Sequence, residues 1–222
     1  MKTKEGFNFS TAFEMEEFLR LSRTIENEEI SINALANHDL LTDNTLLKCA
    51  YFIAYGKKKT PSDVRIIEPT VVTLLINSKK VLQDERLDDF RKLFLLNVPL
   101  IILPLVFRNH WSLLYYRRKT NLWISMDSLS PYHNHYANSV PLVLGERGFL
   151  PPEMSTNTVV RFHSLVRQPP GGWQCGTYTL LFLQIVLTAE DESDIQQSIT
   201  LMNEKTRDGL SRILVSYFRT LL

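Results

Sequence analysis

The chain of 222 residues is long enough to bury a sizeable core within one domain. Apolar residues make up 44% of it, charged residues 22%, and the formal net charge is +1, which is an ordinary globular composition. Because charge is near balance and the one basic run is the lysines at 57–59, we expect no nucleic-acid partner. Its two cysteines, Cys49 and Cys175, give neither a disulfide framework nor a metal-site spacing. We therefore expect no metal and no organic cofactor.

The sequence also predicts that the protein does not enter a membrane. Its first residues contain no apolar core of a secretory signal. The most apolar stretch, 93–107, contains Asn97, Pro99 and Pro104 and is too short to span a bilayer. We expect a monomer in the cytoplasm or the nucleus, where a reducing environment suits so few cysteines.

In chain order, helical patterns precede and follow a cluster of strand patterns. We expect helices from Thr11 and over 44–55, 81–94, 139–150, 175–187, 195–202 and 210–218. We expect strands over 30–35, 98–107, 110–116, 122–126 and 159–166, whereas 69–76 fits either a helix or a strand. No repeat or linker divides the chain. This order indicates one α+β domain over 1–222, with a central, mostly antiparallel sheet flanked by helices.

The stretch 168–187 joins a loop rich in proline and glycine to a long apolar helix. Cys175 lies at the joint, where unpaired amide N–H groups and the positive end of the helix dipole gather. A thiolate is stabilised in such a position, and the thiolate is the nucleophile. The alternative is an inert cysteine packed as a small apolar residue, and this stretch alone favours it.

A cysteine nucleophile needs a base and a third group that orients the base. His110 opens the strand 110–116, and Asp127 ends the strand 122–126 that follows it across a turn. If these strands pair, His110 and Asp127 become cross-strand neighbours, about 5 Å apart at Cβ. The carboxylate could then fix the imidazole tautomer and stabilise its charged form.

The other four histidines have simpler explanations. His133 and His135 lie in a polar loop without a third ligand at metal-site spacing, so we interpret both as surface residues. His38 falls in a turn and His163 in a predicted strand. The coincidence of Cys175, His110 and Asp127 is therefore what favours a nucleophilic site.

Three motifs together resemble the cysteine proteases specific for ubiquitin-like proteins, the family of SUMO proteases and deneddylases that is more distantly related to the adenovirus protease. They are His110-Trp111-Ser112-Leu113-Leu114, then Met126-Asp127-Ser128, then Gln168 ahead of Gln174-Cys175-Gly176. The resemblance covers most of the chain and, by the small size, is closest to the deneddylase branch. It implies a papain-like, adenovirus-protease-like fold.

By this resemblance Cys175 is the nucleophile, His110 the general base and acid, and Asp127 the orienting carboxylate. The resemblance also implies that Gln168 donates to the oxyanion, an interaction typically worth about 3 kcal/mol in such sites. Trp111 would line a narrow channel for the Gly-Gly tail of a modifier, and only glycine lets two backbones approach so closely.

The sequence departs from the family pattern in three places. The family glutamine lies six residues before the cysteine, whereas Gln168 lies seven before. Gln174 replaces the usual aspartate, which leaves open a role for it among the oxyanion donors. In the family motif Trp-Leu-Asn-Asp, which ends here at Asp43, Leu40 replaces the tryptophan that covers the substrate tail.

The resemblance predicts a thiol isopeptidase that cuts after the Gly-Gly of a Nedd-type modifier, SUMO or ubiquitin. It would free the modifier from target lysines or mature its precursor. The alternatives are a module of the same fold that binds a modifier without cleaving it, motivated by the altered loop, and a related acetyltransferase with the same triad.

Overall fold

The computed structural model describes residues 28–60, 62–77, 98–130, 132–155, 158–162, 167–168 and 172–220. The helices predicted from Thr11 and over 81–94 lie outside the described residues, as does His163.

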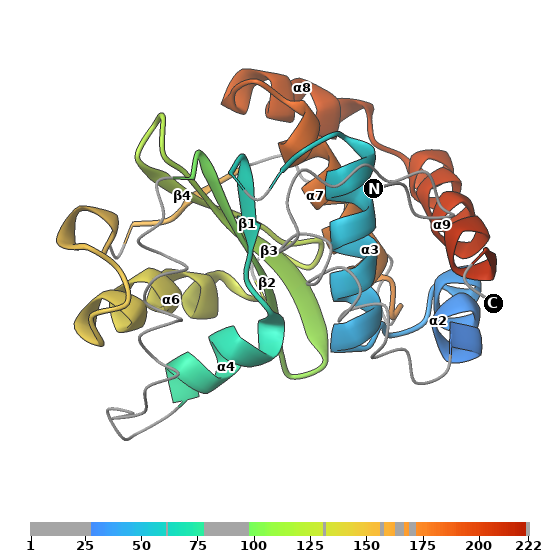
Figure 1. Ribbon diagram of the computed structural model, residues 1–222, viewed down its shortest axis with the longest axis horizontal. Helices are drawn as coiled ribbons and strands as arrows, with labels where there is room; N and C mark the ends of the chain where they lie inside the picture. Colours follow the sequence, from blue (N-terminus) through green and yellow to red (C-terminus); the bar gives the residue numbers. More distant parts are fainter. Residues whose placement is uncertain are drawn as a thin grey trace.

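Among the described residues, five strands form one mixed sheet at the centre of the molecule (Figure 1). They are β1 (Val64–Ile66), β2 (Leu100–Phe107), β3 (His110–Arg117), β4 (Leu122–Met126) and β5 (Val160–Arg161). The strands lie side by side in chain order, with β2, β3 and β4 antiparallel and with β1 and β5 added parallel at the two edges. The predicted antiparallel centre is confirmed, while β1 was missed because three residues are too few to show a period.

Helices cover both faces of the sheet (Figure 1). On one face lie α2 (Glu28–Asn37), α3 (Asp43–Gly56), α7 (Cys175–Thr188), α8 (Glu192–Leu201) and α9 (Glu204–Arg219). On the other lie α4 (Pro69–Asn77), α6 (Asn134–Glu146) and the short 3₁₀ helix η1 (Pro152–Met154). Leu113 and Tyr115 of β3 face the first core, and Leu114 and Tyr116 face the second. Burial on both faces explains why the strands are apolar almost throughout.

The strand predicted over 30–35 is wrong, because these residues belong to helix α2. Their alternation suggested period two, but Ile30 is 53% exposed while Ile32 and Leu35, three apart, are buried. That is the spacing of a helix face. The ambiguous stretch 69–76 is the helix α4, and α3 begins after Thr42, whose side chain caps it by accepting from the Thr45 amide.

Two further boundaries differ from the predictions. Helix α6 runs from Asn134 to Glu146, so it begins and ends before the helix predicted over 139–150, and it includes Pro141. The predicted strand 159–166 is a strand only at Val160–Arg161, and 163–166 lie outside the described residues. The helix from Cys175 and the last two helices are confirmed.

A tight hairpin places His110. Arg108 and Asn109 join β2 to β3 with φ of 51° and 58°, so that Phe107 pairs with His110. Positive φ at both turn residues is the type I′ geometry that matches the twist of a hairpin. His110 is thereby fixed as the first residue of a central strand.

Candidate active site

Cys175 is the first residue of α7 and only 2% exposed. Its thiol donates to the Trp173 carbonyl at 3.9 Å, and Gln174 occupies the N-cap position before it. The next residue must be small, since a Cβ on Gly176 would lie 2.8 Å from Cγ of Leu41. The helix start is thus pressed against the chain at Leu41.

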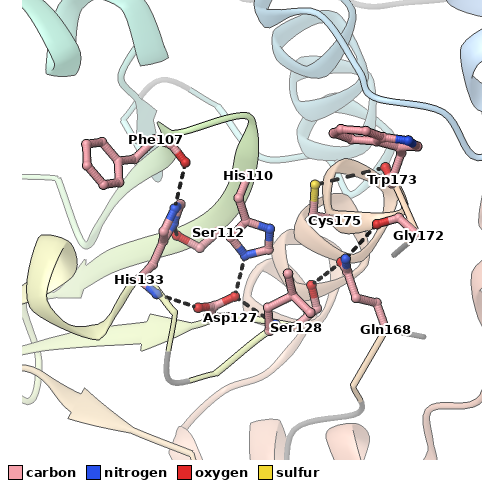
Figure 2. Close-up of polar contacts among 11 residues, drawn as sticks. Phe107, His110, Ser112, Asp127, Ser128, His133, Gln168, Gly172, Trp173 and Cys175 are labelled. Carbon is pink, nitrogen blue, oxygen red and sulfur yellow. Dashed lines mark hydrogen bonds and ion pairs between the residues drawn. The ribbon is translucent and has the colours of Figure 1, made fainter. Parts of the chain in front are cut away.

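The imidazole of His110 donates from Nε2 to Oδ1 of Asp127 at 2.6 Å (Figure 2). Because Nε2 donates its hydrogen bond to the carboxylate, Nδ1 is the ring nitrogen directed at the start of α7, where Cys175 lies (Figure 2). The sequence predicted His110 and Asp127 as immediate cross-strand neighbours, but they are not directly opposite each other. Leu113 pairs with Met126, so the position opposite Asp127 is that of Ser112, and His110 lies two positions further along β3, on the diagonal. The His110 side chain is long enough to reach the Asp127 carboxylate across this diagonal.

Burial alone would lower the pKa of His110. Hydrogen bonds and charge interactions with Asp127 and Cys175 outweigh it and raise that pKa to about 9. The ring is only 4% exposed, so water screens these interactions weakly. The site is built to hold an imidazolium between a carboxylate and a thiol.

Asp127 is held by three donors. Besides His110, the backbone N–H of Leu129 donates to Oδ1 and that of His133 to Oδ2, both at 2.9 Å. Burial by itself would raise the pKa of Asp127, but these hydrogen bonds and the charge of His110 lower it. Asp127 is therefore a fixed carboxylate and not a free turn residue.

The interpretation of His133 as a surface residue is wrong. It is 0% exposed, with Ser112 Oγ at 2.8 Å from Nδ1 and the Phe107 carbonyl at 3.0 Å from Nε2. His135 is exposed, as expected. Both histidines lie in the same polar stretch of sequence. They differ because, at the start of α6, position 133 faces the interior and position 135 faces solvent.

Gln168 reaches the site from the far side of Cys175 (Figure 2). Its side chain accepts from Ser128 Oγ at 2.9 Å and donates from Nε2 to the Gly172 carbonyl at 2.8 Å. Its backbone N–H donates to the Ser128 carbonyl at 3.1 Å. The second N–H of the amide has no partner among the described residues, and Ser128, next to Asp127, is the anchor that the sequence did not reveal.

Gln174 has its side-chain oxygen bonded to Nη1 of Arg207 in α9. Arg207 is buried and also pairs with Asp208. The Gln174 amide is thus tied toward α9. This tie is a second contact that the sequence alone did not suggest.

The residues predicted for the substrate channel lie around Leu41. Trp111 is 1% exposed and donates its indole N–H to the Leu41 carbonyl at 2.9 Å. Leu40 is half-buried against the same core, and Asp43 begins α3. Burial raises the pKa of Asp43. The segment therefore reaches the start of α7 through Leu41. Trp173 lies beside Cys175 and is 52% exposed, so it forms an open aromatic surface there.

The described part of the chain holds no group of three or more His, Cys, Asp or Glu side chains that could bind a metal ion. None of its helices is long and apolar enough to cross a membrane.

Three of the solved structures that this chain resembles in fold are described as proteases. The Ulp1 protease domain in complex with Smt3, the yeast ortholog of SUMO, is 16% identical, with 95% of this chain and 97% of that chain covered and a TM-score of 0.57. The SUMO protease Ulp1 with its catalytic cysteine oxidised to a sulfonic acid is 15% identical, with coverage of 97% and 99% and a TM-score of 0.59. A de-sumoylating protease is 14% identical, with coverage of 86% and 84% and a TM-score of 0.56. At these identities the likeness shows the fold.

Among curated proteins, none matches this sequence. The C-terminal catalytic domain of the Ulp1 protease family, however, matches over residues 46–214, which is most of the chain and spans His110, Asp127 and Cys175. The protein belongs to the Ulp1 protease family and is a cysteine peptidase.

Proposed function

We propose that the protein is a thiol isopeptidase that cleaves after the C-terminal Gly-Gly of a ubiquitin-like modifier, of Nedd type or SUMO. It would deconjugate the modifier from target lysines, mature its precursor, or both. The observation that carries the proposal is the His110 imidazole, bonded to Asp127 on one side and interacting with Cys175 on the other.

The chemistry follows from the positions of these groups. Sγ of Cys175, its proton held by His110, attacks the scissile carbonyl carbon, and His110 then protonates the departing amine. A thioester remains. His110 then takes a proton from water, and the hydroxide adds to the thioester carbon. The C–S bond breaks, which regenerates the Cys175 thiolate and releases the C-terminal carboxylate of the modifier. Asp127 keeps the imidazolium oriented through both steps.

The oxyanion formed in each step needs donors at the start of α7. The backbone N–H of Cys175 has no partner within its own helix, and the free N–H of Gln168 is the side-chain candidate. Because Gln168 is fixed from both sides by Ser128 and Gly172, it needs no reorganisation when charge develops.

The specificity for a modifier is supported by the likeness to the Ulp1 domain solved with Smt3. The close packing around Leu41, Trp111 and Gly176 favours a tail without side chains. We further propose that residues 1–222 form one domain that acts as a monomer in the cytoplasm or nucleus.

A second candidate is a module that binds a modifier without cleaving it. The bond from Gln168 Nε2 to the Gly172 carbonyl favours it, because it occupies one N–H of the expected oxyanion donor. The complete set of Cys175, His110 and Asp127 favours the enzyme.

The two candidates separate in one experiment. Nedd-type modifier, SUMO and ubiquitin, each with a C-terminal thiol-reactive warhead, are incubated with the protein and with Cys175→Ala. We expect covalent capture of one modifier by the wild type and none by the variant. Binding without capture would favour the module, and neither binding nor capture of any modifier would contradict both.

A further inference from the structure

His133 is a buried histidine that the proposed reaction does not use. Both of its ring nitrogens have protein partners (Figure 2). Ser112 Oγ donates to Nδ1 at 2.8 Å, and Nε2 donates to the Phe107 carbonyl at 3.0 Å. A side chain that is 0% exposed and hydrogen-bonded at both ends has one orientation.

These bonds join three parts of the active site. Phe107 is the last residue of β2, and Ser112 lies in β3, so His133 is tied to both strands of the hairpin that carries His110. The backbone N–H of His133 donates to Oδ2 of Asp127 at 2.9 Å. Every residue except proline would have this N–H at position 133, whereas the side chain of His133 additionally anchors it to the hairpin.

The ring of His133 also packs against the ring of His110. Their centroids are 4.5 Å apart and their planes are inclined by 72°, an edge-to-face contact. Tyr132 makes a second such contact with His110, at 5.3 Å and 84°. The His110 imidazole is therefore confined by neighbouring rings as well as by its bond to Asp127.

We propose that His133 is a positioning residue, which locks the Asp127 carboxylate to the β2–β3 hairpin and keeps the His110 imidazole directed at Cys175. This inference rests on the proposed triad and adds a residue to it. The motifs that define the resemblance to the family do not include this position.

The charge state of His133 agrees with this role. Burial lowers the pKa of His133 to about 4. The hydrogen bond to the Phe107 carbonyl acts in the opposite direction, and the positive charge of His110 lowers the pKa further. The titratable groups facing the two rings are Asp127, Cys175, Tyr132 and Tyr136. A neutral His133 neither repels the His110 imidazolium nor competes with it for the carboxylate.

The test uses the full chain with His133→Phe, and with His135→Phe as the matched control in the same segment. Alkylation of Cys175 by iodoacetamide is followed by peptide mass spectrometry across pH 5 to 10, which requires no modifier. We expect His133→Phe to slow alkylation at pH 7 on the order of 10-fold. In the plot of alkylation rate against pH, the change at high pH that reports the deprotonation of His110 should occur below pH 9 in this variant, because the pKa of His110, about 9 in the wild type, falls. His135→Phe should match the wild type.

Two further variants cover a loss of folding in His133→Phe. In His133→Gln the amide can donate to the Phe107 carbonyl, so part of the alkylation rate should return. Ser112→Ala removes only the donor to Nδ1 and should show a smaller effect in the same direction. Wild-type pH profiles in all folded variants, with rates that follow only the folded fraction, would overturn the proposal. If alkylation responds as expected while no warhead is captured, the proposed substrate is wrong and the positioning role stands.

Discussion

The two cysteines of the chain show that burial does not decide what a thiol does. Cys49 and Cys175 are 0% and 2% exposed, and both belong to the same hydrophobic core. Cys49 lies in the middle of α3, and burial raises the pKa of its thiol. Cys175 lies at the first residue of α7 and interacts with the His110 imidazole.

The difference comes from position within the helix and from one partner. A residue in a helix interior is surrounded by satisfied backbone groups, whereas the first residue lies among free N–H groups. The helix start and the contact with His110 are therefore what distinguish Cys175, the proposed nucleophile, from Cys49.

The largest expected effect is on activity. Cys175→Ala should reduce cleavage of a modifier precursor by about 10⁴-fold or more, because the nucleophile is lost. Cys49→Ala should leave the rate within about two-fold, since its side chain is far from any developing charge. Circular dichroism checks that both variants are folded. Persistent cleavage by Cys175→Ala would show that the two cysteines have been assigned the wrong way round.

The next largest effect is on how the free energy of unfolding changes with pH. The raised pKa of His110 means that, between pH 6.5 and about 9, its imidazole holds a proton in the folded state that it lacks in the unfolded state. The stabilisation is complete below pH 6.5 and is lost as pH rises through about 9, on the order of 3 kcal/mol in total. Urea denaturation at a series of pH values measures it.

The cysteines should affect this slope differently. Cys175→Ala removes a partner that raises the pKa of His110, so the decline should become shallower. Cys49 stays protonated in the folded state, so it adds to the decline only near and above its ordinary pKa of 9.0. Cys49→Ala should therefore leave the slope between pH 6.5 and 8.5 unchanged. Equal slopes in all three proteins would contradict the coupling between His110 and Cys175.

Much of this arrangement could be predicted from the sequence, because its signals are local. The apolar runs that became β2 and β3, the turn between β3 and β4, and the start of α7 are each visible over a few residues. The strand predicted over 30–35 failed because a short alternation of isoleucines fits both periods. Only the packing of α2 against α9 decides between them.

The residues of the site divide in the same way, into those that local sequence patterns locate and those that depend on contacts between distant parts of the chain. Cys175, His110 and Asp127 stand at element ends, which sequence patterns locate. His133 and Ser128 act through contacts with β2 and with Gln168, across 26 and 40 positions of the chain. Such contacts depend on the path of the loop after β4, and no residue pattern near His133 distinguishes it from exposed His135. The bond from Arg207 to Gln174 spans 33 positions and was equally hidden.

The smallest effect tests the other half of the comparison, the structural role of Cys49. Cys49→Ala should lower the free energy of unfolding by about 1 kcal/mol, because it removes a packed sulfur from a fully buried position. Cys49→Ser, which has nearly the same size, should cost about 1 kcal/mol more, because its hydroxyl is desolvated in an apolar core. Urea denaturation at pH 7 gives both values, and warhead capture should proceed at the wild-type rate in each variant. If Cys49→Ala lowers the capture rate by more than its loss of folded protein explains, then a change of packing inside α3 affects the active site, and Leu41 is the contact that would carry the effect. In that case the two thiols could not be treated as independent.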